Sequence, residues 1–133
     1  MARRWLFVLG FILFGAGDPA RLRAQDEFPY ERDLVLDARP MSGGKRVPIL
    51  LIERGGRAQI DLWCKRGEGQ AAIVGDAITI TPGAMNDEPC TADRAQADEE
   101  MLAALAAVAN WSARDEVVTL TGAKPLRFRA AAN

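Results

Sequence analysis

The positions of two cysteines, Cys64 and Cys90, constrain the fold more than any other feature of the sequence, and the chain contains no others. They bracket a compact segment in which apolar residues alternate around Gly75-Asp76, a pattern typical of paired β-strands. Cys90 leads directly into the one strongly helical segment. A bond between the two cysteines would therefore tie a sheet to a helix.

The first 24 residues have the pattern of a cleavable export signal. Arg3 and Arg4 supply positive charge, an apolar run extends from Trp5 to Phe14, and Ala24 offers a small residue for cleavage. The apolar run is shorter than the roughly 20 residues that a helix needs to cross a bilayer. We therefore expect a signal peptide over residues 1–24, a periplasmic or secreted bacterial protein, and no membrane span after cleavage.

The remaining segment, residues 25–133, has the length of a single domain. Removal of the signal takes away four of the 17 basic residues and one of the 18 acidic residues, which leaves a net charge of about −4. Affinity for nucleic acid comes mainly from lysine and arginine contacts to phosphates. A mildly acidic domain is therefore expected to have no nucleic-acid partner, and any partner is expected to be a periplasmic protein.

Export also favours a disulfide between the two cysteines, because the compartments outside the cytoplasm are oxidising. A Cys64–Cys90 bond would close a loop of about 27 residues, which the chain-entropy model values at roughly 3–4 kcal/mol. The alternative is a pair of free thiols in the core, since unpaired cysteines are among the most buried residues.

Apolar patterns predict seven strands, with alternation in most of them and with apolar residues in both phases of residues 47–53. They are residues 33–37, 47–53, 57–64, 70–74, 77–81, 117–120 and 126–129. Gly55-Gly56 and Gly75-Asp76 predict tight hairpin turns. A proline cannot donate to a ladder, so Pro48 is expected at a strand start or edge, and Pro82-Gly83 is expected to end the fifth strand.

One helix is predicted over residues 92–109, with Thr91 as its N-cap and Asn110 in the left-handed position after its end. Its buried stripe is formed by Met101, Leu102, Leu105 and Val108, widened by Ala104 and Ala109. The acidic residues of its N-terminal half are explained by the helix dipole; they are Asp93, Asp98, Glu99 and Glu100. The predicted fold is α+β, an antiparallel β-sheet of about seven strands wrapped on one main helix.

From Ile60 to Phe128 the order of these signals resembles the META domain, the domain of HslJ-like bacterial proteins. The matching pieces are Cys64, Gly69 with Gly75, Ile78-Thr79-Ile80, Met85 before Cys90, Asp98 to Leu105, Val118-Thr119-Leu120 and Leu126-Arg127-Phe128. The sequence departs from the family pattern in reading Trp63-Cys64-Lys65 instead of Gly-Cys-Asn, and in placing four residues between Met85 and Cys90. The resemblance implies a META-like fold in an exported or envelope protein. The family is loosely associated with stress response, secretion and motility, and has no established catalytic site.

The residue types in the chain argue against catalysis. There is no histidine, which excludes Ser-His-Asp and Cys-His mechanisms and removes the commonest zinc ligand. Lys65 and Arg66 beside Cys64 favour a reactive thiolate, but the expected partner Cys90 and the missing base count against a nucleophile. Asp87-Glu88 is read as a solvated loop. We expect no enzyme activity, no metal and no cofactor.

Two tryptophans are the side chains most typical of a binding site, although large aromatic residues mostly serve burial. Trp111 follows the helix and is expected in the core. Trp63 falls out of phase with the inward residues of its strand, which makes it a candidate surface residue. Trp63, Lys65 and Arg66 form the predicted interaction surface.

These observations leave three functions open. The first, which we favour, is a non-enzymatic exported META-like domain that acts in envelope stress response or contacts another protein. The second is a small secreted enzyme inhibitor that uses a disulfide-braced loop from Lys65 to Gly69. The third is a thiol redox enzyme, which needs a free or labile Cys64.

Overall fold

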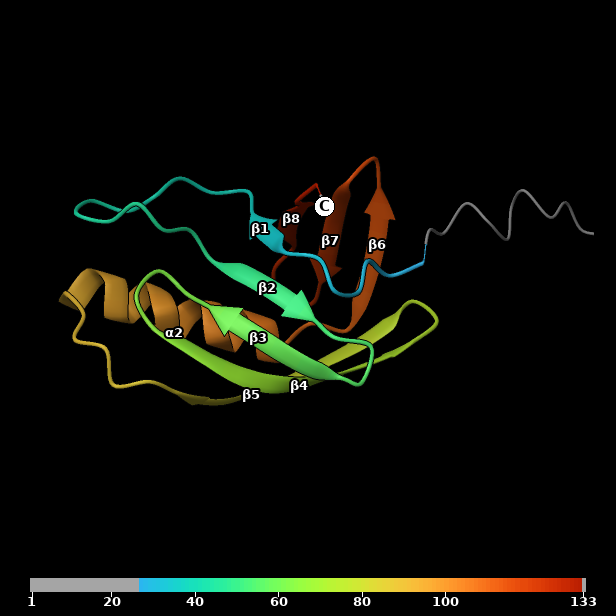
Figure 1. Ribbon diagram of the computed structural model, residues 1–133, viewed down its shortest axis with the longest axis horizontal. Coiled ribbons are helices and arrows are strands. Elements are labelled where there is room, and N and C mark those ends of the chain that lie inside the picture. The colour runs from blue at the N-terminus through green and yellow to red at the C-terminus, as the bar shows by residue number, and fades with distance from the viewer. Residues whose placement is uncertain (1–26, 133) are drawn as a thin grey trace, which may run out of the picture.

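Eight antiparallel strands close into a barrel, each strand lying beside its neighbour in sequence and β8 returning to β1 (Figure 1). The structure is a computed structural model that describes residues 27–132, so the predicted signal peptide lies outside the described residues. The strands are β1 (Leu34–Leu36), β2 (Ile49–Ile52), β3 (Arg57–Asp61), β4 (Arg66–Val74), β5 (Ala77–Met85), β6 (Asn110–Arg114), β7 (Val117–Thr121) and β8 (Leu126–Ala130). One helix, α2 (Ala92–Ala106), connects β5 to β6.

The core lies inside the barrel because alternate residues of each strand point inward. In β3, for example, Ala58 and Ile60 are buried whereas Arg57 and Gln59 are exposed. Buried apolar residues from every strand except β4 meet there, together with residues of α2. They are Leu34, Leu50, Ile52, Ile60, Ile78, Ile80, Trp111, Val118, Leu120 and Phe128 from the strands, with Met101 and Leu105 from α2. The helix therefore adds Met101 and Leu105 of its predicted stripe to a core that the strands enclose, whereas Ala109, also predicted to be buried, is exposed.

The predicted sheet of about seven strands is wrong in two respects, because the sheet closes into a barrel and because it has an eighth strand. β6 carries a single large apolar residue, Trp111, and the small Ala113 among polar ones, so its alternation is weak in sequence. It forms because all five of its residues pair with β7. The α+β class fits residues 27–132, which form antiparallel strands and one helix.

β5 continues through Pro82-Gly83 to Met85, although these two residues were predicted to end it. The N–H of Ile78 donates to the carbonyl of Ala109 and not to β4. Because successive residues of a strand direct their N–H groups to opposite sides, the nitrogen of Pro82 also turns away from β4. A proline is tolerated in that position, where no ladder hydrogen bond with β4 is lost.

The helix ends at Ala106, three residues earlier than predicted. The residues after it pair with strands, since the carbonyl of Ala109 accepts the N–H of Ile78 and the N–H of Ala109 donates to the carbonyl of Thr121. Asn110 is the first residue of β6 and does not take the predicted left-handed position. At the other end Thr91 is the N-cap residue, but its hydroxyl accepts a hydrogen bond from Arg94 in place of a helix N–H.

Candidate functional site

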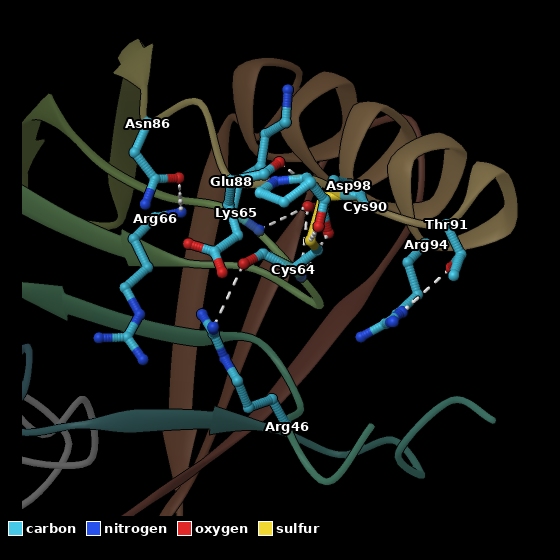
Figure 2. The surroundings of a disulfide bond; sticks show 11 residues. Arg46, Cys64, Lys65, Arg66, Asn86, Glu88, Cys90, Thr91, Arg94 and Asp98 are labelled. Atoms are coloured by element: carbon cyan, nitrogen blue, oxygen red, sulfur yellow. Dashed lines mark hydrogen bonds between the residues drawn. A yellow bond between two sulfur atoms is a disulfide. The ribbon is translucent and has the colours of Figure 1, made fainter. Parts of the chain in front are cut away.

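Cys64 and Cys90 form the predicted disulfide, with their Cα atoms 6.0 Å apart. Cys64 lies just after β3 and is buried, whereas Cys90 lies just before the N-cap of α2 and is half-buried. The bond ties the turn between β3 and β4 to the start of α2 (Figure 2). The redox-enzyme hypothesis needs a free or labile Cys64, and among residues 27–132 Cys64 is not free; a labile Cys64 stays a prediction.

A buried carboxylate lies directly beside the disulfide. Asp98 of α2 is only 2% exposed. Its oxygens accept the backbone N–H of Lys65 at 2.8 Å and that of Cys64 at 3.2 and 3.3 Å (Figure 2). A buried carboxylate needs such donors because its desolvation is costly. Asp98 is thus a second link between α2 and the β3–β4 turn.

The helix-dipole interpretation of Asp98 leaves out its burial and its two backbone donors. The position of Asp98 in the helical repeat could have predicted its burial. Asp98 precedes Met101 by three residues and Leu105 by seven, so it belongs to the same face as the buried stripe. Glu99 and Glu100, which fall off that face, are exposed as expected.

Arg46 approaches the same turn from the side of Cys64 away from Asp98 (Figure 2). Its Nη1 donates to the carbonyl oxygen of Cys64 at 3.2 Å. Its Nη2 is buried and has no hydrogen-bond partner among the described residues. The disulfide is therefore flanked by a satisfied carboxylate on one side and an incompletely satisfied guanidinium on the other.

A shallow groove of about 260 Å³ opens beside Trp63. Its walls come from β1, β8, α2 and the loop before β2, and its lining is mostly apolar: Leu36, Met41, Trp63, Ala97, Met101, Ala104 and Leu126. Glu100 and Lys124 are the charged residues of the lining, and both are exposed. Trp63 is half-buried.

The three residues of the predicted interaction surface, Trp63, Lys65 and Arg66, do not all line this groove. Trp63 lines the groove, but neither Lys65 nor Arg66 does. The side chains of Lys65 and Arg66 leave the turn in different directions (Figure 2). Whether any of the three contacts a partner stays a prediction.

The inhibitor hypothesis relied on a braced loop from Lys65 to Gly69, and this loop prediction is wrong. Residues 66–69 are the first part of β4 and pair with β3, for example Gly67 with Ile60 and Gly69 with Ala58. Strand pairing leaves no protruding segment there. The cause is that β4 begins four residues before the strand that alternation predicted, across glycines that have no side chain to reveal it.

Trp111 is a core residue, as expected. It is 7% exposed, and its indole N–H donates to the carbonyl of Gly75 at 2.8 Å. Its ring meets that of Phe28 edge-to-face, with centroids 5.3 Å apart. The indole therefore fixes the β4–β5 hairpin and the segment before β1 to the same strand.

No helix within residues 27–132 is long and apolar enough to cross a bilayer. The structure resembles a DUF4847 family protein from Bacteroides vulgatus, with a TM-score of 0.50 and 15% sequence identity over 62% of this chain and 57% of that one. At that identity the likeness concerns the fold alone. No curated protein matches the sequence. The family model of the META domain matches residues 30–133. The chain therefore belongs to the META domain family.

Proposed function

We propose that the protein is an exported, non-enzymatic META domain that binds another protein of the cell envelope through the groove beside Trp63, in the service of an envelope stress response. The groove is the observation that carries the proposal. It is built by side chains from four separate parts of the chain, and it presents a large aromatic ring at the surface. Tryptophan is enriched among residues that dominate protein interfaces.

The size and charge of the groove favour a protein side chain over a small molecule. Sites for drug-sized ligands usually enclose about 300–1,000 Å³ and bury most of the ligand, whereas this groove of about 260 Å³ is open. Its apolar floor fits one large apolar side chain of a partner. Glu100 and Lys124 at its rim would complement one basic and one acidic group on either side.

The signal pattern of residues 1–24 and the disulfide support export, because disulfides persist in oxidising compartments. The absence of histidine from the chain supports a non-enzymatic role. Export is tested by N-terminal sequencing of the protein from a periplasmic fraction. A mature chain that starts near residue 25 is the expected result, and full-length protein confined to the cytoplasm would overturn this part of the proposal.

Partner binding is tested by placing a photo-crosslinking amino acid at Ala97, on the helix wall of the groove. The crosslinked protein is identified and purified, and its affinity for the domain is then measured. Trp63→Ala is expected to weaken binding at least tenfold, as is usual for a buried aromatic anchor. The matched control is Val74→Ala, which trims a 78% exposed apolar residue outside the groove. Equal affinities of wild type and Trp63→Ala would show that the groove is not the docking surface.

A further inference from the structure

The disulfide and the buried carboxylate together place three metal-ligand groups in one small volume. The Sγ atoms of Cys64 and Cys90 and a carboxylate oxygen of Asp98 all lie within 4.8 Å of one another. They come from separate parts of the chain, the end of β3, the loop before α2 and the second turn of α2. In the oxidised state the sulfurs are bonded to each other and cannot bind a cation.

We propose that reduction of the Cys64–Cys90 disulfide converts this cluster into a site for a thiophilic divalent cation of the zinc type. A dithiol reductant supplies two electrons and two protons, the S–S bond breaks, and the reductant leaves as its own disulfide. The two thiols then release their protons as their sulfurs bind the cation. Two thiolates and the Asp98 carboxylate supply three ligands, and water completes the tetrahedral set.

The distances suit such an ion after a modest side-chain adjustment. Two thiolates on one zinc ion stand roughly 3.8 Å apart, because each Zn–S bond is about 2.3 Å long. The three ligand atoms already lie within 4.8 Å, so no element of the barrel has to move. The backbone N–H groups of Cys64 and Lys65 hold the Asp98 carboxylate in place, in the way that outer hydrogen bonds orient metal ligands.

The charges around the cluster also suit the reduced, metal-bound state. Two thiolates and one carboxylate around a divalent cation leave one residual negative charge. Arg46 is bonded to the carbonyl of Cys64, and its buried Nη2 has no partner among the described residues. A negatively charged sulfur at Cys64 would give this guanidinium the counter-charge that the neutral disulfide does not provide.

The test compares cation binding by the oxidised and reduced protein. Residues 25–133 are reduced with a phosphine, which is removed without air, and circular dichroism checks that the fold persists. Zinc affinity is measured by calorimetry, and cobalt serves as a spectroscopic probe because thiolate ligands give it charge-transfer absorption. The reduced protein is expected to bind one ion at least 100-fold more tightly than the oxidised protein, with the absorption of two thiolates.

Variants distinguish a zinc site that uses all three ligands from zinc binding by any free thiol. Cys90→Ser, which also lacks the disulfide, is expected to bind at least 100-fold more weakly than the reduced wild type. Asp98→Asn is expected to bind about 10–100-fold more weakly, and Glu99→Gln, an exposed neighbour, is expected to bind as the wild type does. Three results would each overturn the proposal: no binding by the folded reduced protein, equal binding by Cys90→Ser, or loss of the fold on reduction.

Discussion

The carboxylate of Asp98 accepts the backbone N–H of Lys65 at 2.8 Å and so joins α2 to the β3–β4 turn, 33 residues away in sequence. The Cys64–Cys90 bond joins the same turn to the start of the same helix. One link is covalent and the other is a buried, charge-assisted hydrogen bond. Together they hold α2 against the barrel, and substitutions at Asp98 and at the two cysteines measure the contribution of each link to stability.

Asp98→Ala is expected to destabilise the domain by about 3 kcal/mol, because it leaves two backbone N–H groups buried without acceptors. Asp98→Asn keeps one acceptor oxygen and should cost less. Urea denaturation at neutral pH measures both. The control is Glu99→Ala, an exposed neighbour on the same helix, for which we expect a change within about 0.5 kcal/mol. If Asp98→Ala were as mild as the control, the carboxylate would not be a structural link.

The double variant Cys64→Ser/Cys90→Ser should lose roughly 3–4 kcal/mol of unfolding free energy, since the unfolded chain regains the entropy of an open loop of about 27 residues. Chemical denaturation without reductant provides the measurement. Thiol titration of the denatured, unreduced wild type should find no reactive thiol. A titration that finds two thiols per chain would mean that the bridge does not form.

Gly122 follows β7 and lies against Ala107 and Val108, the residues just after α2. A Cβ atom at this position would collide with the carbonyl oxygen of Ala107, which is backbone and cannot turn aside. Gly122→Ala is therefore expected to cost about 1–3 kcal/mol through forced displacement of the helix end. Gly55→Ala, where a Cβ would meet open space, is the control and should be neutral or slightly stabilising. Equal melting temperatures for the two variants would contradict the close approach.

Glu116 closes the β6–β7 hairpin with a positive φ of 67°, which an L-residue with a side chain rarely adopts. Its carboxylate pairs with Arg32 at 2.6 Å, but the side chain of Glu116 is 60% exposed, so the pair contributes little. Glu116→Gly should be about 1 kcal/mol more stable than Glu116→Ala, because only glycine takes this conformation freely. Thermal unfolding of the two variants, both of which lack the ion pair, decides the question.

The candidate site could be predicted only in part. The disulfide followed from the count of cysteines and the export pattern, and Trp63 was recognised as out of phase with its strand. The spacing of Asp98 to Met101 and Leu105 predicts that it lies on the buried face of the helix. The sequence does not predict which groups donate hydrogen bonds to its carboxylate. Arg46 was missed because the Cys64 carbonyl that it contacts lies 18 residues away in sequence.

The sequence by itself determined the features that depend on neighbouring residues. Alternation set which side faces inward in most of the predicted strands, the glycine turn at Gly75 set the β4–β5 hairpin, and the stripe that contains Met101 and Leu105 set the buried face of α2. These features arise from local periodicity, because the repeat of a strand or a helix determines which side chains share a face.

Only the tertiary structure decided what depends on distant partners. β6 became a strand because β7 supplies hydrogen bonds along its whole length, and β5 passed through Pro82 because that nitrogen faces away from β4. The barrel closes where β8 meets β1, a contact between the two ends of the described chain. These features depend on hydrogen-bond partners for buried backbone groups and on packing across the barrel. Neither can be predicted from a short stretch of residues, because the partners are distant in sequence.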